Sequence, residues 1–166
     1  LGLAGDLALA LGVDPSGRAT VVIARIAGAA ALIFISLALL LHMRMRGESR
    51  WPRATRELGV RINKDGVSES FLLVGGGTFV ACYLGGTNFN YRQIFAVFVV
   101  TGLVRAKDSV GFLVAGGLIA VQYLHTAAPQ FLAPVADVLL LGLTAQLIVI
   151  LIQVLRAGSV EESKHA

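Results

Sequence analysis

The stretch 87–93, with the sequence TNFNYRQ, is a short polar connection between two apolar segments of this chain. Its side chains that can bind a ligand are Asn88, Asn90, Tyr91 and Arg92. An arginine makes paired hydrogen bonds to phosphate, and amides and a phenol can hydrogen-bond a phosphate or a sugar. Two interpretations follow: a turn with aromatic residues and one arginine near lipid headgroups, or a binding site for a phosphate or a sugar.

A second polar connection, 125–130, begins with His125. A histidine can carry a proton or bind a metal ion or a pigment. A metal site needs further ligands, and the only cysteine, Cys82, lies inside the apolar run 71–84. We therefore interpret His125 as an interfacial side chain with a local hydrogen bond. It stays the one weak candidate for a metal ligand. We expect no metal site and no cofactor.

The composition indicates that these connections join membrane helices. The chain has 166 residues, of which 56 % are hydrophobic and 14 % charged, whereas a soluble domain has about 25 % charged residues. Its mean hydropathy is +0.78. So few charges cannot cover a globule with polar surface, which excludes an ordinary cytosolic enzyme, a disordered tail and a collagen-like rod.

Apolar segments of nearly membrane-spanning length occur five times. A helix needs about 20 apolar residues to cross a bilayer, and the candidates are 20–42, 70–86, 91–104, 110–124 and 135–155. The fold class expected is therefore all-α, a polytopic membrane bundle of about five transmembrane helices in a single domain. A four-span alternative makes 91–104, the shortest segment, a re-entrant one.

The first residues, 1–13, have a different pattern. Leu3, Leu7 and Leu11 recur every four residues, which predicts an amphipathic helix too short to span the bilayer. We expect this helix to lie on the outer membrane surface or against the bundle.

The basic residues predict the orientation. The linker 43–69 contains seven Lys and Arg residues, and short basic connections stay in the cytoplasm. Alternating the spans from there places the tail 156–166 in the cytoplasm, the N-terminus outside, and eleven of the 14 bases inside. This distribution predicts an integral protein of a bacterial inner membrane. Because the bases lie beside apolar runs, the net charge of +4 does not indicate a nucleic-acid partner.

The same linker is predicted to touch the membrane surface. Residues 55–60 can form a short basic helix at the headgroups, and tryptophan and arginine favour that zone. The membrane lipids are thus expected partners. The predicted headgroup contacts are Arg44, Arg46, Trp51, Arg53 and Arg56.

Small residues recur at helical spacing in two of the segments. They are Gly77, Ala81 and Gly85 in the first, and Gly111 and Ala115 in the second. Such stripes let helices approach closely inside a bilayer, so we expect them to be packing surfaces. A phosphate-binding loop is excluded because no strand precedes the glycines and no Lys-Ser/Thr pair follows them.

Three pieces of the first 105 residues carry a family resemblance: LGLAGDLALALGVDPSGRAT, LHMRMRGESR and YLGGTNFNYRQIFAVF. Their order resembles the C-terminal membrane part of the GT-C class of glycosyltransferases, multi-span enzymes that use polyprenyl-phosphate-linked sugars. The resemblance implies that Asn88, Asn90, Tyr91 and Arg92 contact a lipid phosphate.

The family places a catalytic carboxylate in an early outer loop, and this chain departs from that pattern. The acids on its predicted outer side are Asp6, Asp14 and Asp137, none of which lies in a matching motif. Glycosyl transfer needs such a carboxylate as general base. We therefore predict no catalytic residue in this chain.

These observations favour an integral membrane subunit with a scaffolding or assembly role, which lacks a complete catalytic site and packs against other membrane subunits. The alternative is the C-terminal part of a glycosyltransferase that binds polyprenyl phosphate at 87–93. A channel or transporter subunit is a third interpretation. It is disfavoured because no chain of Asp, Glu and His crosses the bilayer and no inverted repeat is evident.

Overall fold

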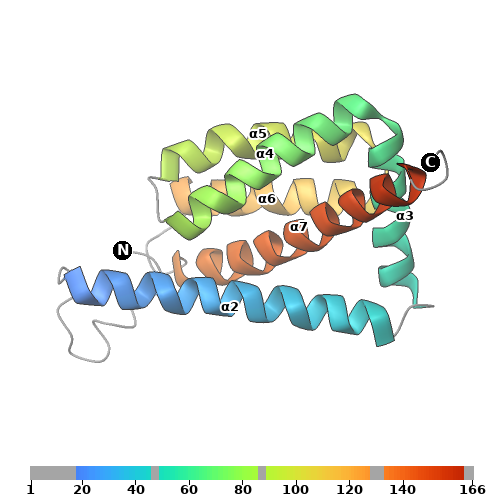
Figure 1. Cartoon of the computed structure of the whole chain (residues 1–166). Coiled ribbons are helices and arrows are strands. Elements are labelled where there is room, and N and C mark those ends of the chain that lie inside the picture. Colours follow the sequence, from blue (N-terminus) through green and yellow to red (C-terminus); the bar gives the residue numbers. More distant parts are fainter. Residues whose placement is uncertain (1–17, 46–48, 86–88, 128–132, 163–166) are drawn as a thin grey trace.

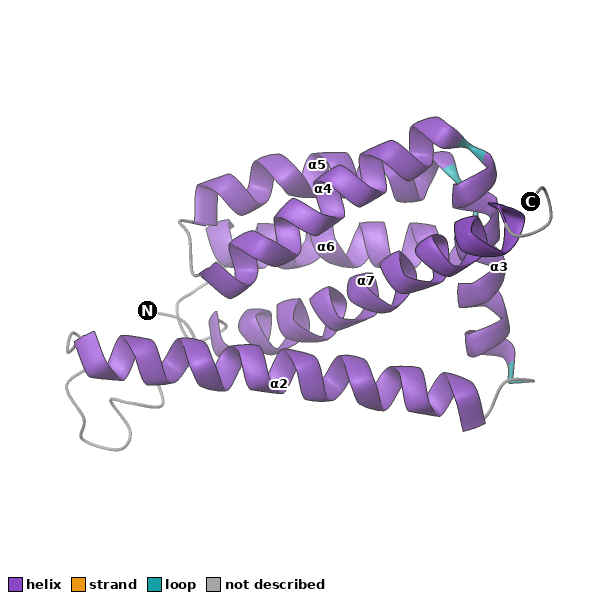
Figure 2. Cartoon of the chain, in the orientation of Figure 1, coloured by secondary structure: helices purple, strands orange, loops and turns teal. Residues whose placement is uncertain are grey.

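The computed structural model describes residues 18–45, 49–85, 89–127 and 133–162, and these residues form α-helices without any strand (Figures 1 and 2). The prediction of an all-α fold is therefore confirmed for the described part of the chain. The predicted amphipathic helix at 1–13 lies outside it. The helices are α2 (Arg18–Met45), α3 (Arg50–Lys64), α4 (Gly66–Gly85), α5 (Phe89–Arg105), α6 (Ser109–Ala127) and α7 (Ala133–Glu162).

Five of these helices run side by side in alternating directions, and α3 lies across one end of them (Figure 1). We call this end of the bundle the α3 end. It contains the last turns of α2, α5 and α7 and the first turns of α4 and α6. The first turns of α2, α5 and α7 lie at the opposite end.

Within the described ranges, three helices are long and apolar enough to cross a membrane. Their apolar stretches are Ile26–Met45, Gly66–Leu84 and Val135–Ser159. The apolar parts of α5 and α6 are shorter, at Gln93–Arg105 and Ser109–Leu124. Integral membrane character is consistent with this finding, and the count of five spans stays a prediction.

An apolar core lies among α4, α5, α6 and α7. Its fully buried side chains include Leu72, Phe79, Val99, Leu103, Leu118 and Leu147. Helix α2 lies outside this core and packs against α7 and α4. Only 17 % of its apolar stretch is buried, so most of α2 presents hydrocarbon to its surroundings.

Several glycines lie at close contacts between helices. A Cβ added at Gly75 would collide with the Cβ of Phe98, so the backbone of α4 contacts a side chain of α5 there. A Cβ at Gly111 would lie 2.8 Å from the carbonyl oxygen of Leu103, between α6 and α5. Ala115, one turn further, is also buried. The described structure thus uses Gly111 and Ala115 at internal contacts.

The other predicted stripe faces away from the bundle. Gly77 and Ala81 are exposed, and no atom lies within 4 Å of a Cβ added at Gly77. The surroundings of Gly85 lie outside the described part. The inward glycines of α4 are instead Gly75 and Gly76, the latter against Leu151 of α7. A packing role for the Gly77 stripe therefore stays a prediction that needs a partner beyond this bundle.

Candidate membrane interface

The amphipathic helix α3 is longer than the helix predicted at 55–60. Pro52 lies in its first turn, where a missing N–H interrupts no helical hydrogen bond. The apolar spacing then continues to Ile62, and the helix ends when Asp65 takes an extended conformation. Most of the predicted linker 43–69 is thus helical. Its buried side is Pro52, Thr55, Leu58, Gly59 and Ile62.

That buried side of α3 packs on protein. A Cβ added at Gly59 would lie 2.8 Å from the Cβ of Gln153, so α3 crosses α7 at van der Waals contact. The apolar side of α3 is consequently occupied by the bundle, and its charged side and its first turn are what remain for headgroups. Trp51, Arg53 and Arg56 are exposed, which is compatible with the predicted headgroup contacts without testing them.

The middle of α3 is bound to the end of α2 through Arg56. The guanidinium Nη2 of Arg56 donates a hydrogen bond of 2.9 Å to the carbonyl oxygen of Met43 in the last turn of α2. The last carbonyls of a helix have no partner inside the helix, and a cation there also compensates the helix dipole. Arg56 therefore holds the α2–α3 corner together.

The C-terminal end of α3 is bound to α4 and α5 through Asp65. Its Oδ2 accepts a hydrogen bond of 2.7 Å from the hydroxyl of Ser68 and another of 2.7 Å from Nε of Arg105. The Ser68 hydrogen bond, followed by the Arg105 guanidinium, holds the pKa of the Asp65 carboxyl below its usual range.

A second acid, Asp108, closes the connection between α5 and α6. Its Oδ1 accepts a hydrogen bond of 2.9 Å from the backbone N–H of Val110, which caps the start of α6. Its Oδ2 lies 3.8 Å from Nη1 of Arg61 on α3. Lys107 bends the chain with a positive φ of 51°. Neither Asp65 nor Asp108 is among the residues predicted from the sequence, although a lone acid in a short turn just before a helix is a signal for a cap.

The basic residues of the described part gather at the α3 end. The bases at the opposite end of the bundle are Arg18, Arg92 and, inside the first half of α2, Arg25. Arg46 and Lys164 lie outside the described residues. The charge asymmetry predicted from the sequence is thus present along the bundle, and the assignment of the basic end to the cytoplasm stays a prediction. The bases at the α3 end are Arg44, Arg50, Arg53, Arg56, Arg61, Lys64, Arg105, Lys107 and Arg156.

The predicted phosphate contacts lie at the opposite end. Asn90, Tyr91 and Arg92 belong to the first turn of α5. Their side chains, Asn88 as a whole and the side chain of His125 are outside the described part. The lipid-phosphate site and the histidine therefore stay predictions. Among the described residues, no group of three or more His, Cys, Asp or Glu is placed to hold a metal ion.

Comparisons with protein-family models, with curated proteins and with solved structures found no match to this chain. The resemblance to GT-C glycosyltransferases therefore stays a prediction. The candidate membrane interface at the α3 end rests on the geometry of the described residues alone.

Proposed function

We propose that this chain is an integral membrane module with a scaffolding role, which packs against further membrane subunits. The observation that carries the proposal is the outward face of α4. Val74 is 67 % exposed, and Gly77 and Ala81 follow it on the same face as exposed small residues. Inside a bilayer, a face of small residues lets another helix come close enough for strong van der Waals contact.

The two kinds of glycine in α4 support this proposal. Phe98 and Leu151 of the same bundle occupy the space beside Gly75 and Gly76, whereas the space beside Gly77 is open. A glycine in a helix interior costs about 1 kcal/mol relative to alanine in water. The inward glycines offset that cost by close packing, and a partner helix would do the same for Gly77.

The proposed location is a bacterial inner membrane, with the α3 end in the cytoplasm and the first turn of α2 at the outer side. The accumulation of bases at the α3 end supports this orientation, because basic connections are retained in the cytoplasm. Five spans fit the lengths of the helices. The 17 residues of α5 and the 19 of α6 extend over about 26 and 28 Å at 1.5 Å per residue, close to the bilayer core.

The proposal is tested by purifying the full chain from its native membrane and identifying the membrane proteins that accompany it in fixed stoichiometry. Gly77→Ile should release such a partner while circular dichroism shows unchanged helix content. The matched control is Gly116→Ile in α6, an exposed glycine that also has no atom within 4 Å of an added Cβ.

Three outcomes would contradict the scaffolding role. They are a wild-type chain that purifies alone, a Gly77→Ile variant that keeps its partner, and a Gly116→Ile variant that loses the partner equally. A longer native chain with an acidic outer loop would instead favour the glycosyltransferase alternative, because that loop would supply the missing general base.

A further inference from the structure

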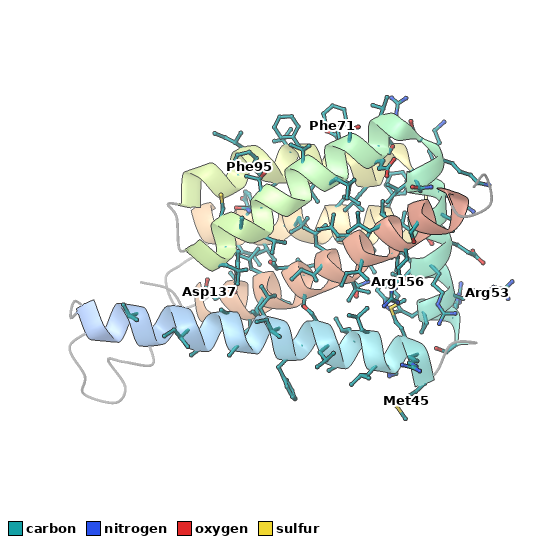
Figure 3. All side chains as sticks on the ribbon, in the orientation of Figure 1. Met45, Arg53, Phe71, Phe95, Asp137 and Arg156 are labelled. Atoms are coloured by element: carbon teal, nitrogen blue, oxygen red, sulfur yellow. The ribbon has the colours of Figure 1, made fainter. Side chains whose placement is uncertain are left out.

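Gln146 lies in the middle of the longest apolar stretch of the described chain. That stretch, Val135–Ser159 of α7, has 25 residues and is long enough to cross a membrane, and Gln146 lies one residue from its centre. In Figure 3 it belongs to the part of α7 halfway between the labelled Asp137 and Arg156. An amide at this depth of a bilayer is out of reach of the bulk water on either side.

The amide of Gln146 is buried without an acceptor. Only 8 % of the residue is exposed, and its Nε2 has no hydrogen-bond partner among the described residues. The buried hydroxyls of Ser36 and Thr144 differ, because each donates a hydrogen bond of 2.7 Å to the carbonyl oxygen four residues earlier in its own helix. A buried donor without an acceptor destabilises a protein. The Gln146 amide therefore indicates a hydrogen bond to a group that the described residues do not supply.

The side of α7 that carries Gln146 is open in the two preceding turns. Val138, Leu139 and Gly142 lie at helical spacing before Gln146 and so share its face. Val138 is 54 % and Leu139 is 47 % exposed. Gly142 is exposed as well, and no atom lies within 4 Å of a Cβ added to it. A helix seated on this face would approach the backbone of α7 one turn from the buried amide.

Rotation of the Gln146 side chain connects its amide with this face. The side chains of a helix slant toward its N-terminus, so the long side chain of Gln146 has the turn of Gly142 within its reach. The open space at Gly142 leaves room for the amide and for the group that pairs with it.

We propose that the face formed by Val138, Leu139 and Gly142 binds a transmembrane helix of another subunit, and that a hydrogen-bonding side chain of this helix pairs with the Gln146 amide. Polar side chains of this kind join helices inside a bilayer. A lipid tail would cover the face and leave the amide without an acceptor, and a buried water molecule needs two to four polar groups to hold it. The inference rests on the proposed function, and it adds a second contact face and the chemistry of the helix that fits it.

The test uses the full chain in its native membrane with a photoreactive benzoylphenylalanine in place of Leu139. Cross-linking should join the chain to a membrane helix of another subunit, and mass spectrometry should find a hydrogen-bonding side chain in the cross-linked segment. Gln146→Met should lower the cross-linked fraction about three- to fifteenfold, which corresponds to one hydrogen bond between membrane helices. Thr144→Val is the matched control and should leave the fraction unchanged, because the Thr144 hydroxyl is bonded within α7.

The melting temperature of the isolated chain in detergent separates an outside partner from an internal water molecule. Methionine has nearly the length and volume of glutamine, so Gln146→Met should leave that temperature unchanged or raise it by removing the unpaired amide. A lower melting temperature would mean that a water molecule inside the chain satisfies the amide, and it would overturn the proposal.

The proposal is also overturned if Leu139 cross-links only to lipid or to a second copy of this chain, if Gln146→Met leaves the fraction unchanged, or if Thr144→Val lowers it equally. A second photoreactive position, Val74 on the outward face of α4, distinguishes these failures from a failure of the proposed function. A partner captured at Val74 alone would refute only the contact at Gln146, whereas the absence of any protein partner at both positions would refute the scaffolding role.

Discussion

Nε of Arg105 lies 2.7 Å from Oδ2 of Asp65, although the two residues are 40 positions apart in the chain. This ion pair joins the last residue of α5 to the turn between α3 and α4, and the hydroxyl of Ser68 shares the same carboxylate oxygen. Three helices thus meet at one acid. Together with Asp108 and Arg61, the pair fixes how α3 lies across the end of the bundle.

Asp65→Asn should destabilise the protein at about pH 7 and lose this effect in acid. The folded-state pKa of Asp65 lies below its usual value of 3.8. Its contribution to stability is therefore fully present above that usual value and disappears as the pH falls through the folded-state pKa. Thermal unfolding in detergent, followed by circular dichroism, should show a wild-type melting temperature that drops in acid toward that of the variant.

The control for this experiment is Glu57→Gln, which removes an exposed ion pair within α3. Exposed pairs of this kind contribute about 0–1 kcal/mol, so the melting temperature should hardly change. If the difference between the wild type and Asp65→Asn were the same at all pH values, the ionised carboxylate would not be the stabilising group.

Gly75→Ala should destabilise the bundle, because an added Cβ would collide with Phe98 and approach the backbone N of Val99 at 3.2 Å. Overpacking of this kind costs about 1–3 kcal/mol. Gly77→Ala is the neighbouring control, since the added methyl meets open space and should stabilise the helix slightly. Detergent titration at constant temperature measures both, and equal effects of the two variants would mean that α4 is rotated differently about its axis.

Single cysteines should reveal five spans and the predicted orientation once Cys82 is replaced by serine. Lys107→Cys and Arg53→Cys should react with an impermeant maleimide from the cytoplasmic side, because Asp108 and Arg61 hold the α5–α6 turn against α3. Asn88→Cys should react from the outer side. Labelling of Lys107→Cys from the outer side would favour the four-span alternative, in which 91–104 is re-entrant.

Arg92→Ala tests the predicted lipid-phosphate site at the start of α5. If Arg92 binds polyprenyl phosphate, its loss should weaken binding by about 10- to 100-fold, since a hydrogen bond to a charged group contributes about 1.5–3 kcal/mol. Binding is measured with the purified chain in detergent. Arg18→Ala, at the same end of the bundle, should leave binding unchanged. Unaltered binding in Arg92→Ala would eliminate the site, and a loss of assembly alone would make the turn structural.

Much of the fold could be predicted because its signals are local. An apolar run of membrane-spanning length forms a helix wherever it lies, since its backbone must satisfy its own hydrogen bonds in lipid. The extent of α3 was harder to predict. Pro52 lies before the helix predicted at 55–60, yet it belongs to the first turn of α3, where a proline is tolerated.

The sequence by itself determined that this protein is helical and apolar, with its bases gathered between particular segments. Hydropathy and charge belong to each residue regardless of its neighbours. Only the tertiary structure decided that Gly75 packs inward while Gly77 faces outward, and that Arg105 reaches Asp65 while Arg56 reaches α2. The rotation of a helix about its axis, and the partner of a charge distant in sequence, depend on which helices lie beside it.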